Sequence, residues 1–218
     1  MRQNPSFTLT DPVELKRLIR ENPWAILVAQ TDGELVASHY PVLLDESRAD
    51  ISIVSHVGKP DEQLLELGEH ELLVIIQGPH GYVSPGWYDA RPAVPTWNFV
   101  VAHLTGVPEI LSDEENYSVL AALVDHFEDR MPHPRRMAGT PENAEYAARI
   151  MTGTVGFRLT PTKIVAKNKM SQNKPADSVD TIIRELEGDG PYATRALAAE
   201  MRRTHERMRA AKSRPLVE

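Results

Sequence analysis

The chain has 218 residues, with 24 Lys and Arg against 31 Asp and Glu, which gives a net charge of -7. It has no cysteine, which excludes a disulfide framework, a zinc finger and a cysteine nucleophile. No apolar run approaches the ~20 residues of a membrane span, and no secretory leader opens the chain, so we expect a soluble cytoplasmic protein. The acidic balance argues against broad binding of nucleic acid, which needs clustered Lys and Arg.

The first third of the chain predicts one helix followed by strands with short connections. Asp11 is placed to cap the helix, Pro12 suits its first turn, and Pro23 ends it. Asp32 and Gly33 predict a tight hairpin, because both central positions of such a turn need positive φ. The expected elements are a helix over 11–22, strands over 24–31, 34–44 and 50–57, a short helix over 60–68 and a strand over 71–77.

The rest of the chain begins with a segment rich in proline and glycine, over 78–95, which predicts a long rigid loop. Ser112 and Glu115 form a capping box that opens a later helix. The remaining expected elements are a strand over 96–111, helices over 112–127 and 141–151, strands over 153–159 and 163–167, a helix over 175–187, and a last helix from residue 191.

This order of elements predicts an α+β fold. Hairpin connections dominate the strands, so the sheet should be mostly antiparallel, and its closure into a barrel would remove the exposed edges. We expect one domain over 1–190, followed by a basic C-terminal helix and tail over 191–218. Residues 195–214 hold seven basic and two acidic side chains, a net charge near +5, which favours a solvated helix end over contact with nucleic acid or an acidic partner.

Three polar clusters interrupt the apolar strands, at 38–41, 55–59 and 167–174. In the second of them, the Ser55 hydroxyl and the Lys59 ammonium could hold a phosphate, and Gly58 would allow close backbone approach. Ordinary strand-end polarity is the alternative. The eight His have no ligand spacing, so we expect no metal site. Trp87, Tyr88 and Trp97 either stack on a planar ligand or pack in the core.

The segment over 77–88, followed by Val94-Pro-Thr-Trp-Asn98, resembles the signature of the FMN-binding negative transcriptional regulators, the PaiB-like family. Shorter matches lie at 33–39, 136–138, 155–157 and 169–173. The family is similar to the split-barrel flavoproteins. The resemblance therefore implies a six-stranded antiparallel Greek-key split β-barrel, the FMN-binding split barrel, with peripheral helices. It also implies a homodimer that binds FMN in grooves at the subunit interface.

The resemblance also implies a set of cofactor-binding residues. Ser55 and Lys59 match the phosphate positions, and Ser38 matches a strand edge that faces the isoalloxazine. The full set is Ser38, His39, Ser55, His56, Lys59, Trp97, Asn98, Lys169, Ser171 and Gln172. Two positions depart from the family pattern: Asp61 replaces a neutral amide and could repel a phosphate, and Asn168 replaces an aromatic residue that could stack or contact a partner subunit. A deazaflavin, a haem or no cofactor are the alternatives to FMN.

Three functions follow as hypotheses. The first is an FMN-binding homodimer related to the transcriptional regulators. The second is a flavin- or deazaflavin-dependent oxidoreductase acting on a small molecule, for which His39 and His56 are the candidate acids or bases because their ordinary pKa lies near neutrality. The third is a DNA-binding repressor that uses the basic tail, and it is the weakest because no helix-turn-helix is evident.

Overall fold

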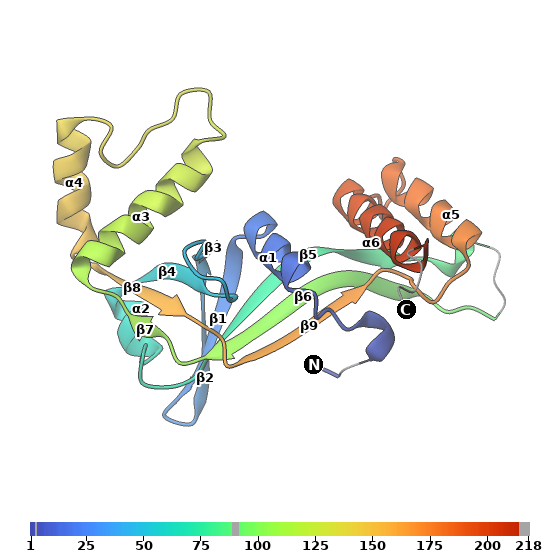
Figure 1. Ribbon diagram of the computed structural model, residues 1–218, viewed down its shortest axis with the longest axis horizontal. Coiled ribbons are helices and arrows are strands. Elements are labelled where there is room, and N and C mark those ends of the chain that lie inside the picture. The colour runs from blue at the N-terminus through green and yellow to red at the C-terminus, as the bar shows by residue number, and fades with distance from the viewer. Residues whose placement is uncertain (3, 89–91, 214–218) are drawn as a thin grey trace. The chain divides into compact units, whose positions relative to one another are not determined.

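The computed structural model describes residues 1–2, 4–88 and 92–213 (Figure 1). The chain divides into two compact units. The terminal unit comprises Met1–Leu9, Gly78–Val101 and Ala166–Glu218, and the central unit comprises Thr10–Gln77 and Ala102–Val165. The expected division at residue 190 stays a prediction.

The strands of the described residues form two sheets. One has five strands in the order β2-β1-β5-β6-β9, and the other has four in the order β3-β4-β8-β7. The strands are β1 Trp24–Thr31, β2 Glu34–Pro41, β3 Leu43–Leu44, β4 Ile53–Gly58, β5 Leu72–Val83, β6 Thr96–Gly106, β7 Glu109–Ile110, β8 Thr154–Leu159 and β9 Lys163–Lys169.

The α+β class with antiparallel pairing is confirmed. Strand β1 is antiparallel to both β2 and β5, and β4 is antiparallel to both β3 and β8. The expected number of six strands is not confirmed, because the described residues form a sheet of five strands and a sheet of four. One cause is that the strand expected over 34–44 is interrupted at Val42, and the one expected over 96–111 is interrupted between Gly106 and Glu109.

The central unit holds four helices among its described residues: α1 Pro12–Glu21, α2 Lys59–Leu64, α3 Asp113–Glu128 and α4 Pro141–Met151. The carboxylate of Asp11 accepts a hydrogen bond of 2.9 Å from the backbone N–H of Val13, which confirms the expected cap of α1. Asp32 and Gly33 take φ values of 51° and 82° between β1 and β2, so the expected hairpin is also confirmed. The capping box of Ser112 and Glu115 opens α3.

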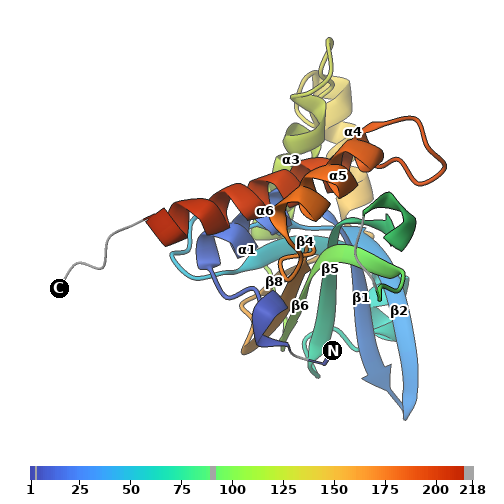
Figure 2. The same cartoon turned by 90° about the vertical axis from the view of Figure 1, so that its right-hand side faces the viewer.

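The described residues of the terminal unit form two 3-10 turns, η1 Pro5–Phe7 and η2 Pro85–Trp87, and the helices α5 Ala176–Glu187 and α6 Arg195–Ser213. The two α-helices lie side by side (Figures 1 and 2). The loop expected over 78–95 is wrong for residues 78–83, which continue β5. A Cβ at Gly81 would lie 3.0 Å from Cδ2 of Leu197 in α6. Gly81 therefore allows α6 to pack closely on β5. From sequence alone, a glycine of this kind cannot be told apart from a glycine in a turn.

Three arginines of the basic C-terminal helix are paired with acidic residues. Arg202 pairs with Glu187 at 2.8 Å, Arg203 with Glu200 at 2.8 Å, and Arg209 with Asp180 at 3.8 Å. Two of these acids, Glu187 and Asp180, belong to α5, so the packing of the two helices offsets part of the positive charge that the sequence places in this segment. Within the described part of the chain, no helix combines the length and the apolar character that crossing a membrane requires.

Candidate functional site

In the central unit, Asp61 organises a polar cluster at the start of α2. Its Oδ2 accepts hydrogen bonds from the Ser38 hydroxyl at 2.7 Å and from the Tyr40 hydroxyl at 2.8 Å. The backbone N–H of Gly58 donates to the Tyr40 oxygen at 3.1 Å. Ser38 and Tyr40 are two residues apart on β2 and therefore point to the same face. The sequence marked Asp61 as a carboxylate that could repel a phosphate. In the structure this carboxylate accepts hydrogen bonds from two hydroxyl groups.

The surroundings of Tyr40 in this cluster raise its pKa above the ordinary value. Burial raises the pKa of Tyr40, the N–H of Gly58 opposes that shift, and the hydrogen bond and charge of Asp61 raise the pKa further. We expect Asp61→Asn to lower the pKa of Tyr40, because the neutral amide no longer disfavours the phenolate. An ultraviolet absorbance titration of the folded protein measures this change, and Tyr40→Phe assigns the signal. A Tyr40 pKa that stays the same or rises in Asp61→Asn would contradict the role given to the carboxylate.

The other expected residues of the central unit lie near this cluster in the sequence but differ in their surroundings. Ser55 is fully buried, and its hydroxyl donates to the carbonyl of Pro41 at 2.6 Å. A hydroxyl carries one proton, so Ser55 offers no donor to a phosphate in this structure. Lys59 is exposed at the first position of α2. His39 stacks on Trp24, with ring centroids 6.4 Å apart.

His56 is partly buried on β4, and its ring meets that of Tyr40 edge-on at 5.8 Å. Its Nδ1 is buried and has no hydrogen-bond partner among the described residues. Burial lowers the pKa of His56, because the apolar surroundings disfavour the charged ring. The imidazole is therefore held neutral near pH 7, with one ring nitrogen unsatisfied.

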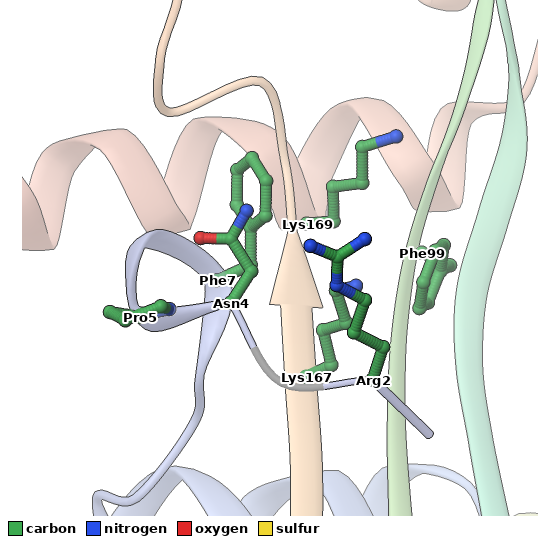
Figure 3. A pocket seen from close by; sticks show the side chains of 7 residues that line it. All are labelled: Arg2, Asn4, Pro5, Phe7, Phe99, Lys167 and Lys169. Atoms are coloured by element: carbon green, nitrogen blue, oxygen red, sulfur yellow. The ribbon is translucent and has the colours of Figure 1, made fainter.

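In the terminal unit, a cavity of about 610 Å³ is lined largely by cationic and aromatic side chains (Figure 3). We call it the basic cavity, and its lining residues are Arg2, Asn4, Pro5, Phe7, Phe99, Lys167 and Lys169. The alternation of β9 explains its position. Asn168 is buried and donates to the hydroxyl of Thr204 in α6 at 3.0 Å. Lys167 and Lys169 lie on the opposite face of the strand.

The lysines of the basic cavity lie beside aromatic rings and beside one another. Nζ of Lys167 is 5.6 Å from the ring centroid of Phe99 and 6.0 Å from that of Phe7. Lys169 donates to the hydroxyl of Thr96. Burial lowers the pKa of Lys169, and so do the charges of Lys167 and Lys174. Lys169 also lines a second cavity of about 330 Å³, together with Phe7, Thr96, Ser171 and Lys174.

Three expected site residues of the terminal unit, Asn98, Ser171 and Gln172, have polar groups that are hydrogen-bonded within the protein. Asn98 is fully buried and donates to the Ser171 hydroxyl at 3.0 Å. The Gln172 side chain donates to the carbonyl of Asn168 at 2.6 Å and accepts from the N–H of Met170 at 2.7 Å. These bonds fix the chain as it leaves β9.

Trp97, by contrast, is 55% exposed on β6. It stacks on His80 with ring centroids 6.5 Å apart. Its indole therefore presents aromatic surface to solvent, as a stacking residue requires.

The structure brings together residues that sequence reasoning missed. Lys167 lies in one of the recognised polar clusters, but the strand expected over 163–167 stops short of Lys169. Because β9 runs to Lys169, the two lysines lie two residues apart on one strand and share a face. No pattern in the sequence indicated Arg2, Phe7 or Phe99, because the first two lie far from β9 along the chain and meet it only through folding. A cavity of this size is within the usual range for small-molecule sites, roughly 300–1,000 Å³. Its cations suit the phosphate of a flavin nucleotide.

Comparisons with solved structures place the fold among proteins that bind flavins. A FAD and heme binding protein from Mycobacterium smegmatis is 21% identical, with a TM-score of 0.57, and the match covers 79% of this chain and 78% of that one. The flavocytochrome Anf3 from Azotobacter vinelandii is 15% identical, also with a TM-score of 0.57, over 78% and 72% of the two chains. At these identities the likeness establishes the fold alone.

The protein belongs to the family described as "Putative FMN-binding domain", which matches residues 1–163. A curated relative, the protease synthase and sporulation protein PAI 2 of Bacillus subtilis, is 28% identical over 185 residues, which are 84% of this chain and 87% of the relative. The family expected from the sequence is confirmed, and FMN is the cofactor that this membership assigns.

Proposed function

We propose that the protein binds FMN as a split-barrel homodimer related to the PaiB-like regulators. The observation that carries this proposal is the family match over residues 1–163. The six-stranded Greek-key arrangement, the dimer and the cytoplasmic location are parts of the proposal. The dimer is supported by the exposed aromatic surface of Trp97, since aromatic residues are enriched at protein interfaces.

FMN supplies redox chemistry when it is bound, and the chain contributes binding and orientation. In the terminal unit we propose Lys169 as a phosphate contact and Trp97 as a stacking residue, because both reach a cavity or solvent. In the central unit, Lys59 and His39 remain our proposed contacts. We assign Ser55, Asn98 and Gln172 to support of the local backbone, because their polar groups are engaged within the protein.

The two alternatives have less support. For the DNA-binding repressor, the ion pairs of Arg202, Arg203 and Arg209 reduce the positive charge offered to phosphates. For the oxidoreductase, burial lowers the pKa of the candidate His56 and so favours its neutral ring. That property suits an acceptor of hydrogen bonds better than a general acid.

The absorbance spectrum and the native mass of the freshly purified full chain test the proposal. We expect a flavin spectrum, a released ligand with the mass of FMN, and a particle of twice the chain mass. Added FMN should stabilise ligand-free protein by about 2.7 kcal/mol at one hundred times Kd, and riboflavin, which lacks the phosphate, should stabilise it less. Protein that is colourless, monomeric and not stabilised by excess FMN would refute the proposal.

A further inference from the structure

One wall of the basic cavity is the N-terminal segment, and this segment is held in place by specific bonds. The backbone N–H of Leu9 donates to the carbonyl of Ala166 at 3.1 Å, and Thr8 forms an antiparallel bridge with Lys167. The side chain of Asn4 caps η1 by accepting from the N–H of Ser6 at 3.0 Å. The start of the chain therefore extends along the edge of β9, and this places Arg2 beside the lysines.

The charges on the cavity wall are all of one sign. Arg2, Lys167 and Lys169 line it, no acidic side chain does, and no ion pair joins these three cations to a carboxylate among the described residues. Figure 3 shows Arg2 and Lys167 extending into the space between β9 and Phe99. Like charges gathered beside apolar rings repel one another more strongly than they would in bulk water. An anion in the cavity would relieve this repulsion.

The hydrogen-bond donors of the basic cavity are of the kinds that bind phosphate. A guanidinium offers a planar fork of N–H groups, and ammonium groups offer point charges, which together suit the several oxygens of a phosphate. Asn4 can add a further donor or acceptor. The rings of Phe7 and Phe99 line the cavity beside Lys167. A carboxylate has only two oxygens for three cationic groups, so phosphate is the better fit.

We propose that the basic cavity is a phosphate-binding site, with Arg2 and Lys167 as its principal ligands. This inference goes beyond the proposed function, because it applies whether the phosphate belongs to the flavin nucleotide or to a separate small molecule. It also gives the N-terminal segment a role, because Arg2 reaches the site only when that segment lies along β9.

Isothermal titration of the full chain with inorganic phosphate, at constant ionic strength, tests this site. We expect wild-type protein to bind phosphate, and both Arg2→Gln and Lys167→Gln to bind it about tenfold or more weakly, as the loss of a charged hydrogen bond implies. Lys163→Gln is the matched control, because Lys163 lies on the same strand, is exposed and does not line the cavity. Arg2 is exposed, so its variant tests the site without disturbing the core.

Absence of phosphate binding by wild-type protein would overturn the inference, and so would equal binding by wild type, Arg2→Gln and Lys167→Gln. A repeat with saturating FMN identifies the source of the phosphate. Competition would assign the cavity to the phosphate of the flavin nucleotide, and simultaneous binding would assign it to a separate ligand. Phosphate binding that depends on Arg2 in a protein that binds no FMN would refute the proposed function and leave this site established.

Discussion

Replacing Phe157 with alanine is expected to lower the free energy of unfolding by about 3–5 kcal/mol. Phe157 is fully buried on β8 and lies opposite Ser55 in the antiparallel pairing with β4. Removal of its ring takes away buried apolar area and leaves a cavity that the surrounding strands fill only in part. Because β4 also carries His56, the loss should loosen the strand that holds two of the expected site residues.

Urea unfolding followed by circular dichroism measures this change. Phe127→Ala is the control, because Phe127 on α3 is 42% exposed and its removal should cost much less. A loss of stability in Phe157→Ala that does not exceed the loss in Phe127→Ala would show that β8 is not part of the core. The slope of the transition should stay unchanged if only the native packing is affected.

Gly156→Ala is expected to destabilise the protein by about 1–3 kcal/mol, through overpacking. A Cβ at Gly156 would lie 2.8 Å from Oδ1 of Asn116 and 3.0 Å from its Cα. Asn116 cannot easily yield, because its amide donates to the hydroxyl of Thr154 at 3.0 Å and its Cα belongs to α3. The substitution therefore forces either the helix or the strand to shift.

The matched control is Gly190→Ala, where an added Cβ would meet no atom within 4 Å. Thermal unfolding of the two variants compares the addition of one methyl group at a closely packed position, Gly156, with the same addition at Gly190, where there is space for it. We expect a lower Tm for Gly156→Ala and little change for Gly190→Ala. Equal Tm values in the two variants would contradict the close packing of α3 on β8.

The local elements of the fold were predictable because their signals are local. The cap at Asp11, the hairpin at Asp32 and Gly33, and the capping box at Ser112 each depend on residues within a few positions of one another, and each is present. The extension of β5 through residues 78–83 was not predictable, because Gly81 stands there for close packing against Leu197 and not for a turn. The expected number of six strands is not confirmed, in part because short interruptions divide two of the expected strands.

For the candidate site, the sequence showed which polar side chains interrupt the strands, but it did not show what those side chains contact. Ser38, expected to face the isoalloxazine, donates to Asp61, and Tyr40 donates to the same carboxylate. Ser55 and Asn98 combine a polar type with full burial. A buried polar group must find a partner inside the protein, and the sequence cannot show whether that partner is a ligand or another part of the chain.

The sequence by itself determined the family, the α+β class and the caps and turns, because these depend on motifs and on neighbouring residues. Only the tertiary structure decided that Arg2, Phe7, Phe99 and Lys167 share one cavity and that Asp61 accepts from two hydroxyls of β2. The physical reason is distance along the chain: these groups meet through strand pairing and packing of residues remote in sequence. The contacts that define a binding site likewise join residues that are remote in sequence.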